Sequence, residues 1–137
     1  MSKAEFKFEG IITPKMLKEA AKPTFAVAFK IDKPLMDAIK KANPNKTGLA
    51  DYAIKAIKAN LHDLDSVLLA LMDESKRIQE YDIRSSMMHV TLDVSEVLKG
   101  AEDFLKIKGY TRVGAGRLTV ACMLLSADAE RLIPQQK

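Results

Sequence analysis

The stretch "VTLDVSEVLKG" at residues 90–100 decides the fold, because its pattern changes midway. Apolar and polar residues alternate from Val90 to Val94, which is typical of a strand with one buried face. From Ser95 onward the apolar residues recur at helical spacing, and a serine followed by an acidic residue is typical of a helix N-terminus. The stretch therefore predicts a short strand at residues 88–94 that leads directly into a helix capped by Ser95.

The same order of elements occurs earlier in the chain, in "TFAVAFKIDKPLMDA" at residues 24–38. Residues alternate up to Ile31, and Asp32 is then placed as the N-cap of a helix. Each copy continues through a turn into a second helix, for which Thr47 and Thr111 are the N-cap candidates. Because the spacing from strand to second helix is nearly equal in both copies, the chain is predicted to contain a strand–helix–helix unit twice.

The residues between and around the two copies complete the predicted organisation. Residues 62–84 hold 6 Asp/Glu against 3 Lys/Arg, which makes this segment acidic. Leu64, Leu68, Leu71 and Ile78 are expected to point inward from it, which predicts an acidic helical connector. Near the N-terminus, Thr13 and Pro14 are typical of the start of a short helix. The predicted segments are an N-terminal arm (1–23), the first copy (24–61), the connector (62–84), the second copy (85–126) and a tail (127–137).

Composition and charge restrict the class of protein. The 137 residues are 47% hydrophobic and 29% charged, which is ordinary for one globular domain. The net charge is +4, and residues 1–61 carry 12 Lys/Arg against 6 Asp/Glu. A basic part of this kind permits binding to nucleic acid but does not require it, since many basic faces are simply solvated.

Other classes of site find no support in the sequence. No apolar run reaches the roughly 18 residues of a membrane span, and the N-terminus lacks a signal-peptide pattern, so a cytoplasmic protein is expected. Cys122, the single cysteine, falls among core positions, and His62 and His89 have no neighbours at metal-ligand or triad spacing. The glycine-rich stretch at residues 109–117 lacks the G-K-[ST] of a phosphate loop. We expect no enzyme activity, no metal and no cofactor.

The two copies resemble the ribbon-helix-helix DNA-binding superfamily. The second copy, "HVTLDVSEVLKGAEDFLKIKGYTRVGAGRLTVACML", follows the family pattern from strand through "GYTR" into the second helix. The first copy, "AVAFKIDKPLMDAIKKANPNKTGLADYAIKAI", follows it with "NKTG" at the turn. Two copies within one chain are similar to accessory DNA-binding proteins of conjugative and T-DNA transfer systems.

The resemblance implies a mainly α fold with a two-stranded antiparallel β-ribbon, as a tandem ribbon-helix-helix pseudo-dimer. One unit has a single strand, whose N–H and C=O groups need a partner, and family members obtain it by dimerising. Here the second copy would supply that partner within the chain, so we expect residues 25–31 to pair with residues 88–94. The apolar faces of both strands would then pack on the helices.

The resemblance also implies which residues contact double-stranded DNA. The outward side chains of a ribbon read base edges in the major groove, and here these are Ala26, Ala28, Lys30, His89, Thr91 and Asp93. The N-termini of the second helices bind backbone phosphate in the family, which by carry-over assigns this role to Lys46, Thr47, Gly48, Thr111 and Arg112. The alternative is that both threonines act only as helix caps.

Two features leave the function open at this point. The alanines of the first strand and Asp93 of the second depart from the polar residues usual on a DNA-reading ribbon, which favours a protein-interaction module with the acidic connector as its docking surface. For a DNA-binding protein, the unlike strand faces predict a non-palindromic or shape-based preference. Transcription regulation, plasmid partition and conjugation are all compatible roles. By analogy with the family, we expect further copies side by side along DNA.

Overall fold

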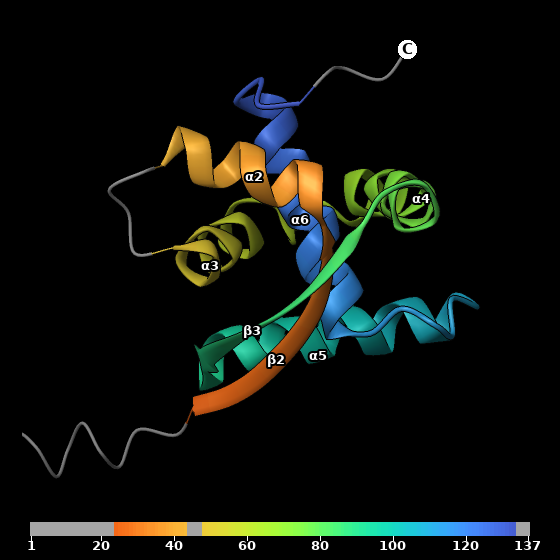
Figure 1. The fold of residues 1–137 in the computed structure, drawn as a ribbon. Helices are drawn as coiled ribbons and strands as arrows, with labels where there is room; N and C mark the ends of the chain where they lie inside the picture. Colours follow the sequence, from red (N-terminus) through yellow and green to blue (C-terminus); the bar gives the residue numbers. More distant parts are fainter. Residues whose placement is uncertain (1–23, 44–47, 134–137) are drawn as a thin grey trace, which may run out of the picture.

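The structure, a computed structural model, describes residues 24–43 and 48–133. Its elements follow in the order β2 (Thr24–Asp32), α2 (Lys33–Ala42), α3 (Leu49–Asn60), α4 (Leu64–Glu80), β3 (Ile83–Thr91), α5 (Leu92–Ile107) and α6 (Ala115–Ala129). The two strands pair as an antiparallel ribbon against the helices (Figure 1). The predicted class, mainly α with a two-stranded antiparallel ribbon, is confirmed. The predicted N-terminal arm, including the short helix expected in it, lies outside the described residues, and so do Lys46 and Thr47.

The register of the ribbon differs from the predicted one. Thr24 lies opposite Thr91, Ala28 opposite Met87, and Asp32 opposite Ile83. The second strand therefore begins and ends earlier than the predicted residues 88–94. The reason lies in α5, where Val94, Leu98, Ala101 and Leu105 are buried at helical spacing. Val94 belongs to this helical stripe, so the chain must leave the strand before it.

The helix starts that follow the strands are capped in different ways. Asp32 caps α2 as predicted, because its carboxylate accepts a hydrogen bond of 2.9 Å from the backbone N–H of Leu35. The predicted cap Ser95 is wrong, since it lies inside α5 and Thr91 occupies the N-cap position.

The second helices begin later than predicted. Gly48 is the N-cap of α3 and has a φ of 118°, a conformation that favours glycine. Thr111 does not cap α6, which begins only after Gly114. The backbone N–H of Tyr110 still bonds to the Leu105 carbonyl, so the chain remains attached to the end of α5 as far as Tyr110. The residues that follow Tyr110 bring the chain back to the ribbon before α6 begins.

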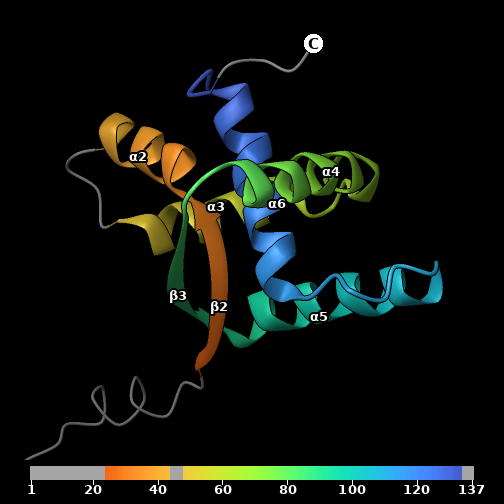
Figure 2. The same cartoon turned by 45° about the vertical axis from the view of Figure 1, so that its right-hand side comes forward.

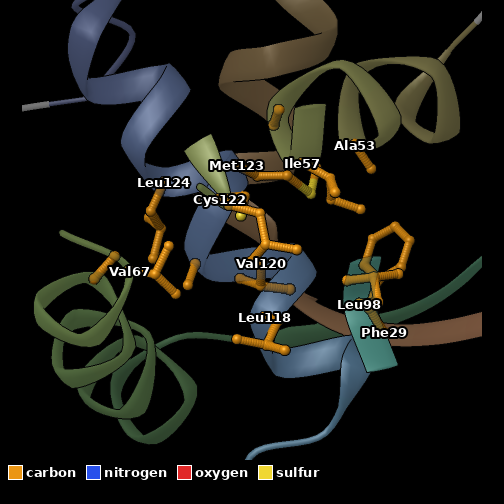
Figure 3. Close-up of a cluster of buried hydrophobic side chains, with 14 of the residues drawn as sticks. Phe29, Ala53, Ile57, Val67, Leu98, Leu118, Val120, Cys122, Met123 and Leu124 are labelled. Atoms are coloured by element: carbon orange, nitrogen blue, oxygen red, sulfur yellow. The ribbon is translucent and has the colours of Figure 1, made fainter. Parts of the chain in front are cut away.

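Helix α6 occupies the centre of the core. Every side chain from Leu118 to Leu124 is buried, and α3, α4 and β2 all pack against this helix. Figure 3 shows Val67 of α4 on one side of α6, with Ile57 of α3 and Leu98 of α5 on another. Cys122 is buried here as predicted, and its burial raises the pKa of the thiol to about 12. A helix that is apolar all round is stable only when surrounded in this way.

The acidic connector is an integral part of the core. Within α4, Val67, Ala70 and Leu71 are buried against the rest of the protein, and so are the charged side chains of Glu74 and Arg77. Of the residues predicted to point inward from this segment, Leu71 is buried, Leu64 and Leu68 are half-buried, and Ile78 is exposed. Arg77 donates hydrogen bonds of 2.9 and 3.0 Å to Asp32, which ties α4 to the end of β2. In the described part of the chain, no helix has the length and apolar character needed to span a membrane.

Candidate nucleic-acid interface

The β2–β3 ribbon has one buried and one exposed face. Phe29, Ile31, Met88 and Val90 are buried beneath it. The other face, here called the outer face, consists of four cross-strand pairs, all exposed: Thr24 with Thr91, Ala26 with His89, Ala28 with Met87, and Lys30 with Ser85. In Figure 2 the helices α4, α5 and α6 lie on one side of the ribbon.

Most of the residues predicted to point outward from the strands do lie on the outer face. These are Ala26, Ala28, Lys30, His89 and Thr91. Their contact with DNA bases stays a prediction.

Asp93 does not lie on the outer face, and its predicted position is wrong. It belongs to the first turn of α5, where its carboxylate accepts a hydrogen bond from the Thr91 hydroxyl. This hydrogen bond lowers the pKa of Asp93, and the charge of Lys58 on α3 lowers it further. Asp93 also lines an apolar groove of about 580 Å³ between α3 and α5. The outer face is therefore free of negative charge among its eight residues.

Three residues of the outer face, Thr24, Ser85 and Met87, are not among the residues predicted to contact DNA bases. Ser85 and Met87 both precede the strand predicted at residues 88–94. Met88 is buried, whereas the exposed fraction of Met87 is 56%. Ser85, Met87, His89 and Thr91 alternate along the whole of β3. A predicted strand that began at Ile83 would therefore have placed Ser85 and Met87 on the same face as His89.

The outer face carries little charge. Lys30 is its only charged residue, and the paired Ala28 and Met87 keep its centre apolar. A two-stranded ribbon fits the major groove of B-DNA, where hydroxyl, imidazole and ammonium groups find base-edge partners and apolar side chains contact the thymine methyl. His89 and Thr91 of β3 offer hydrogen bonds, while Ala26 and Ala28 of β2 offer only apolar contact.

A cavity of about 540 Å³, here called the α6 pocket, adjoins the outer face at the N-terminus of α6. Lys30 and Ser85 reach it from the ribbon, Arg112 from the turn before α6, and Glu74 and Arg117 from α4 and α6. Gly114, the N-cap of α6, makes no side-chain capping bond, and it lines the pocket together with Gly116. The first N–H groups of a helix lack partners within the helix and carry its positive dipole end, so they favour an anion.

One of the cations in the α6 pocket is neutralised. Arg117 forms an ion pair with Glu74 at 2.9 Å, and Glu74 is buried. Burial raises the pKa of Glu74, while the guanidinium of Arg117 opposes this shift. Neither Lys30 nor Arg112 has an ion-pair partner among residues 24–43 and 48–133. The pocket thus offers two uncompensated positive charges beside a helix N-terminus.

The predicted phosphate-binding residues are only partly brought together. Arg112 lines the α6 pocket, although it precedes the helix and does not begin it. Thr111 is exposed in the same turn, and Gly48 lies with open space around it at the start of α3. Lys30, which was predicted to read bases, shares the pocket with Arg112. Arg117 and Ser85 also line the pocket, although neither was predicted to bind phosphate.

Comparison with known proteins gives no family for the chain, because no family model, curated protein or solved structure matches it. The part of the chain that the structure describes contains no group of three or more His, Cys, Asp or Glu residues that could hold a metal ion. The outer face and the α6 pocket are the two features on which the proposed function rests.

Proposed function

We propose that the chain binds double-stranded DNA as a tandem ribbon-helix-helix pseudo-dimer. The outer face of the ribbon enters the major groove, and the α6 pocket binds a backbone phosphate. The observation that carries this proposal is the meeting of Lys30, Arg112 and the N-terminus of α6 in one pocket directly beside an exposed ribbon face. Helix N-termini supplemented by Lys or Arg are common phosphate sites in DNA-binding proteins.

The packing between the two copies supports the pseudo-dimer. The strands pair antiparallel, one from each copy, and the second helices α3 and α6 pack against each other. Each second helix also packs against the strand of the other copy, since α6 contacts β2 and α3 contacts β3. Such crossed packing is expected when two units exchange strands around a common core, as in a dimer of separate chains.

The unlike strands shape the expected recognition. On the outer face, β3 presents His89 and Thr91, whereas β2 presents Ala26 and Ala28. Base readout therefore falls mainly to β3, and we infer a non-palindromic or shape-based preference. The proposed role is that of an accessory or regulatory protein in the cytoplasm, in transcription, partition or DNA transfer, with copies able to assemble along DNA.

Salt-dependent binding to a random-sequence duplex tests this proposal. Fluorescence anisotropy between about 50 and 200 mM NaCl gives the slope of log affinity against log salt, to which each phosphate contact contributes about −0.9. Lys30→Ala and Arg112→Ala should each make the slope shallower by up to about 0.9, while Lys76→Ala, an exposed control on α4, should leave it unchanged. Absence of binding at low salt would contradict the proposal.

A second candidate, a protein-interaction module, is favoured by one feature of α4. Leu69 and Met72 in the acidic connector have exposed fractions of 69% and 65%, and at three residues apart they are neighbours on one face of the helix. A protein partner docking on α4 would cover both. Under this alternative the duplex would not bind, and the variants of the α6 pocket would have no effect on partner binding.

A further inference from the structure

Arg117 directs most of its hydrogen-bonding capacity at the protein itself. Its Nε donates to Glu74 Oε1 at 3.0 Å, and its Nη2 donates to Ser75 Oγ at 2.8 Å and approaches Glu74 Oε1 at 2.9 Å. Its Nη1 donates to the backbone carbonyl of Arg112 at 3.1 Å. These three hydrogen bonds leave two of the five N–H groups of the guanidinium for any further partner.

Arg112, unlike Arg117, has a side chain without an ion-pair partner among the described residues and a backbone that is held in place. Its side chain is exposed and has no ion pair within the described ranges, while its backbone is held by the bond from Arg117. The turn between α5 and α6 is also held at its start, where Gly109 and Tyr110 bond to carbonyls of α5, and after Arg112, where Val113 is buried in the core. Between these two anchors, the bond from Arg117 holds the turn at Arg112 itself, which reaches the α6 pocket.

We propose that Arg117 is a positioning residue of the α6 pocket and does not itself bind phosphate. Neutralised by Glu74 and oriented by Ser75, it holds the carbonyl of Arg112 and so directs the free guanidinium of Arg112 toward the DNA backbone. This inference rests on the proposed function. It makes α4 the support of the phosphate site, since Glu74 and Ser75 both belong to that helix.

The chemistry of arginine explains why lysine would not serve. A guanidinium is a planar fork whose N–H groups point in fixed, different directions, so it can bridge a carboxylate, a hydroxyl and a carbonyl at once. A lysine ammonium carries the same charge on one atom at the end of a flexible chain. Arg117→Lys therefore preserves the charge of the pocket but loses the simultaneous grip on Glu74, Ser75 and the Arg112 carbonyl.

The salt dependence of DNA binding separates positioning from direct contact. We expect Arg117→Lys to make the slope shallower by as much as Arg112→Ala does, up to about 0.9. The double variant Arg112→Ala/Arg117→Lys should bind like Arg112→Ala alone. Arg84→Lys, at an exposed arginine on β3 outside the outer face, is the matched control and should bind like the original protein. A slope for Arg117→Lys equal to that of the original protein, or additive losses in the double variant, would overturn the inference.

Limited trypsin digestion tests the same inference without DNA. Trypsin cleaves after Arg112 only if the turn can open, so Arg117→Lys should be cleaved there several times faster, with cleavage after Lys99 in α5 as the internal reference. Equal rates at Arg112 in both proteins would refute the positioning role. If the original protein binds no duplex, the proposed function fails, yet the digestion still decides whether Arg117 holds the turn.

Discussion

Gly116 of α6 lies against the backbone of Ala28 in β2, so closely that a Cβ added at Gly116 would stand 2.5 Å from the Ala28 carbonyl oxygen. Real Cβ atoms do not approach a backbone oxygen to this distance, so only glycine fits here without a shift of the ribbon or the helix. The contact joins the start of the central helix to the middle of the ribbon. It therefore sets how the outer face and the α6 pocket lie relative to each other.

We predict that Gly116→Ala lowers the free energy of unfolding by about 1–3 kcal/mol, the usual cost of overpacking, despite the better helix propensity of alanine. Gly100→Ala is the matched control, because Gly100 also lies in a helix but has nothing within 4 Å of an added Cβ. It should raise the free energy of unfolding by about 0.5–1 kcal/mol. Denaturant titration measures both, and equal effects of the two substitutions would show that α6 does not touch the ribbon in this way.

Removal of Arg77 should destabilise the fold far more than removal of its neighbour in the chain. Arg77 and Asp32 are both buried and pair through two hydrogen bonds, so Arg77→Ala leaves the Asp32 carboxylate without its charge partner. The expected loss in the free energy of unfolding is about 3–5 kcal/mol. The exposed Lys76 on the same helix provides the control, and Lys76→Ala should change it by less than about 0.5 kcal/mol. A loss below about 1 kcal/mol for Arg77→Ala would mean that the pair is solvated.

Glu74 predicts a characteristic dependence of stability on pH. Burial raises the pKa of Glu74 above its ordinary value of 4.5, so the folded protein keeps this proton to a higher pH than the unfolded chain does. The contribution of Glu74 is thus fully present below pH 4.5 and is lost as the pH rises through the folded-state pKa. Glu74→Gln lacks this titration. The difference in free energy of unfolding, original protein minus Glu74→Gln, should fall from pH 4 to 7, and a rise would show a lowered pKa instead.

The sequence carries the alternation of the strands clearly but not their limits. In "VTLDV", Val90, Leu92 and Val94 fit a strand, while Val94 also begins the buried stripe of α5. Packing decides between the two patterns, because Leu92 is left 47% exposed and Val94 is buried. The cap at Ser95 and the position of Asp93 were mispredicted for this single reason. Cross-strand pairing as such was predictable, since each of the two predicted strands needs a partner for its N–H and C=O groups.

The polar parts of the fold and site depend on residues far apart in the chain. Glu74 and Arg77 look like solvated residues of an acidic helix, and only their partners Arg117 and Asp32 explain their burial. Lys30 and Arg112 likewise belong to different copies and meet only once the ribbon lies beside α6. Local sequence patterns carry no information on contacts between residues far apart in the chain, so the α6 pocket could not have been derived from the sequence alone.

Photocrosslinking from the ribbon tests the central claim most directly. Two methionines of similar exposure lie on different surfaces: Met87 at the centre of the outer face, 56% exposed, and Met72 on α4, 65% exposed. Each is replaced in turn by the photoreactive residue p-benzoylphenylalanine, and the protein is irradiated with a labelled duplex at low salt. If the ribbon enters the groove, position 87 should crosslink to DNA and position 72 should not. Crosslinks from position 72 alone, or from neither position while the duplex is bound, would contradict DNA binding through the ribbon.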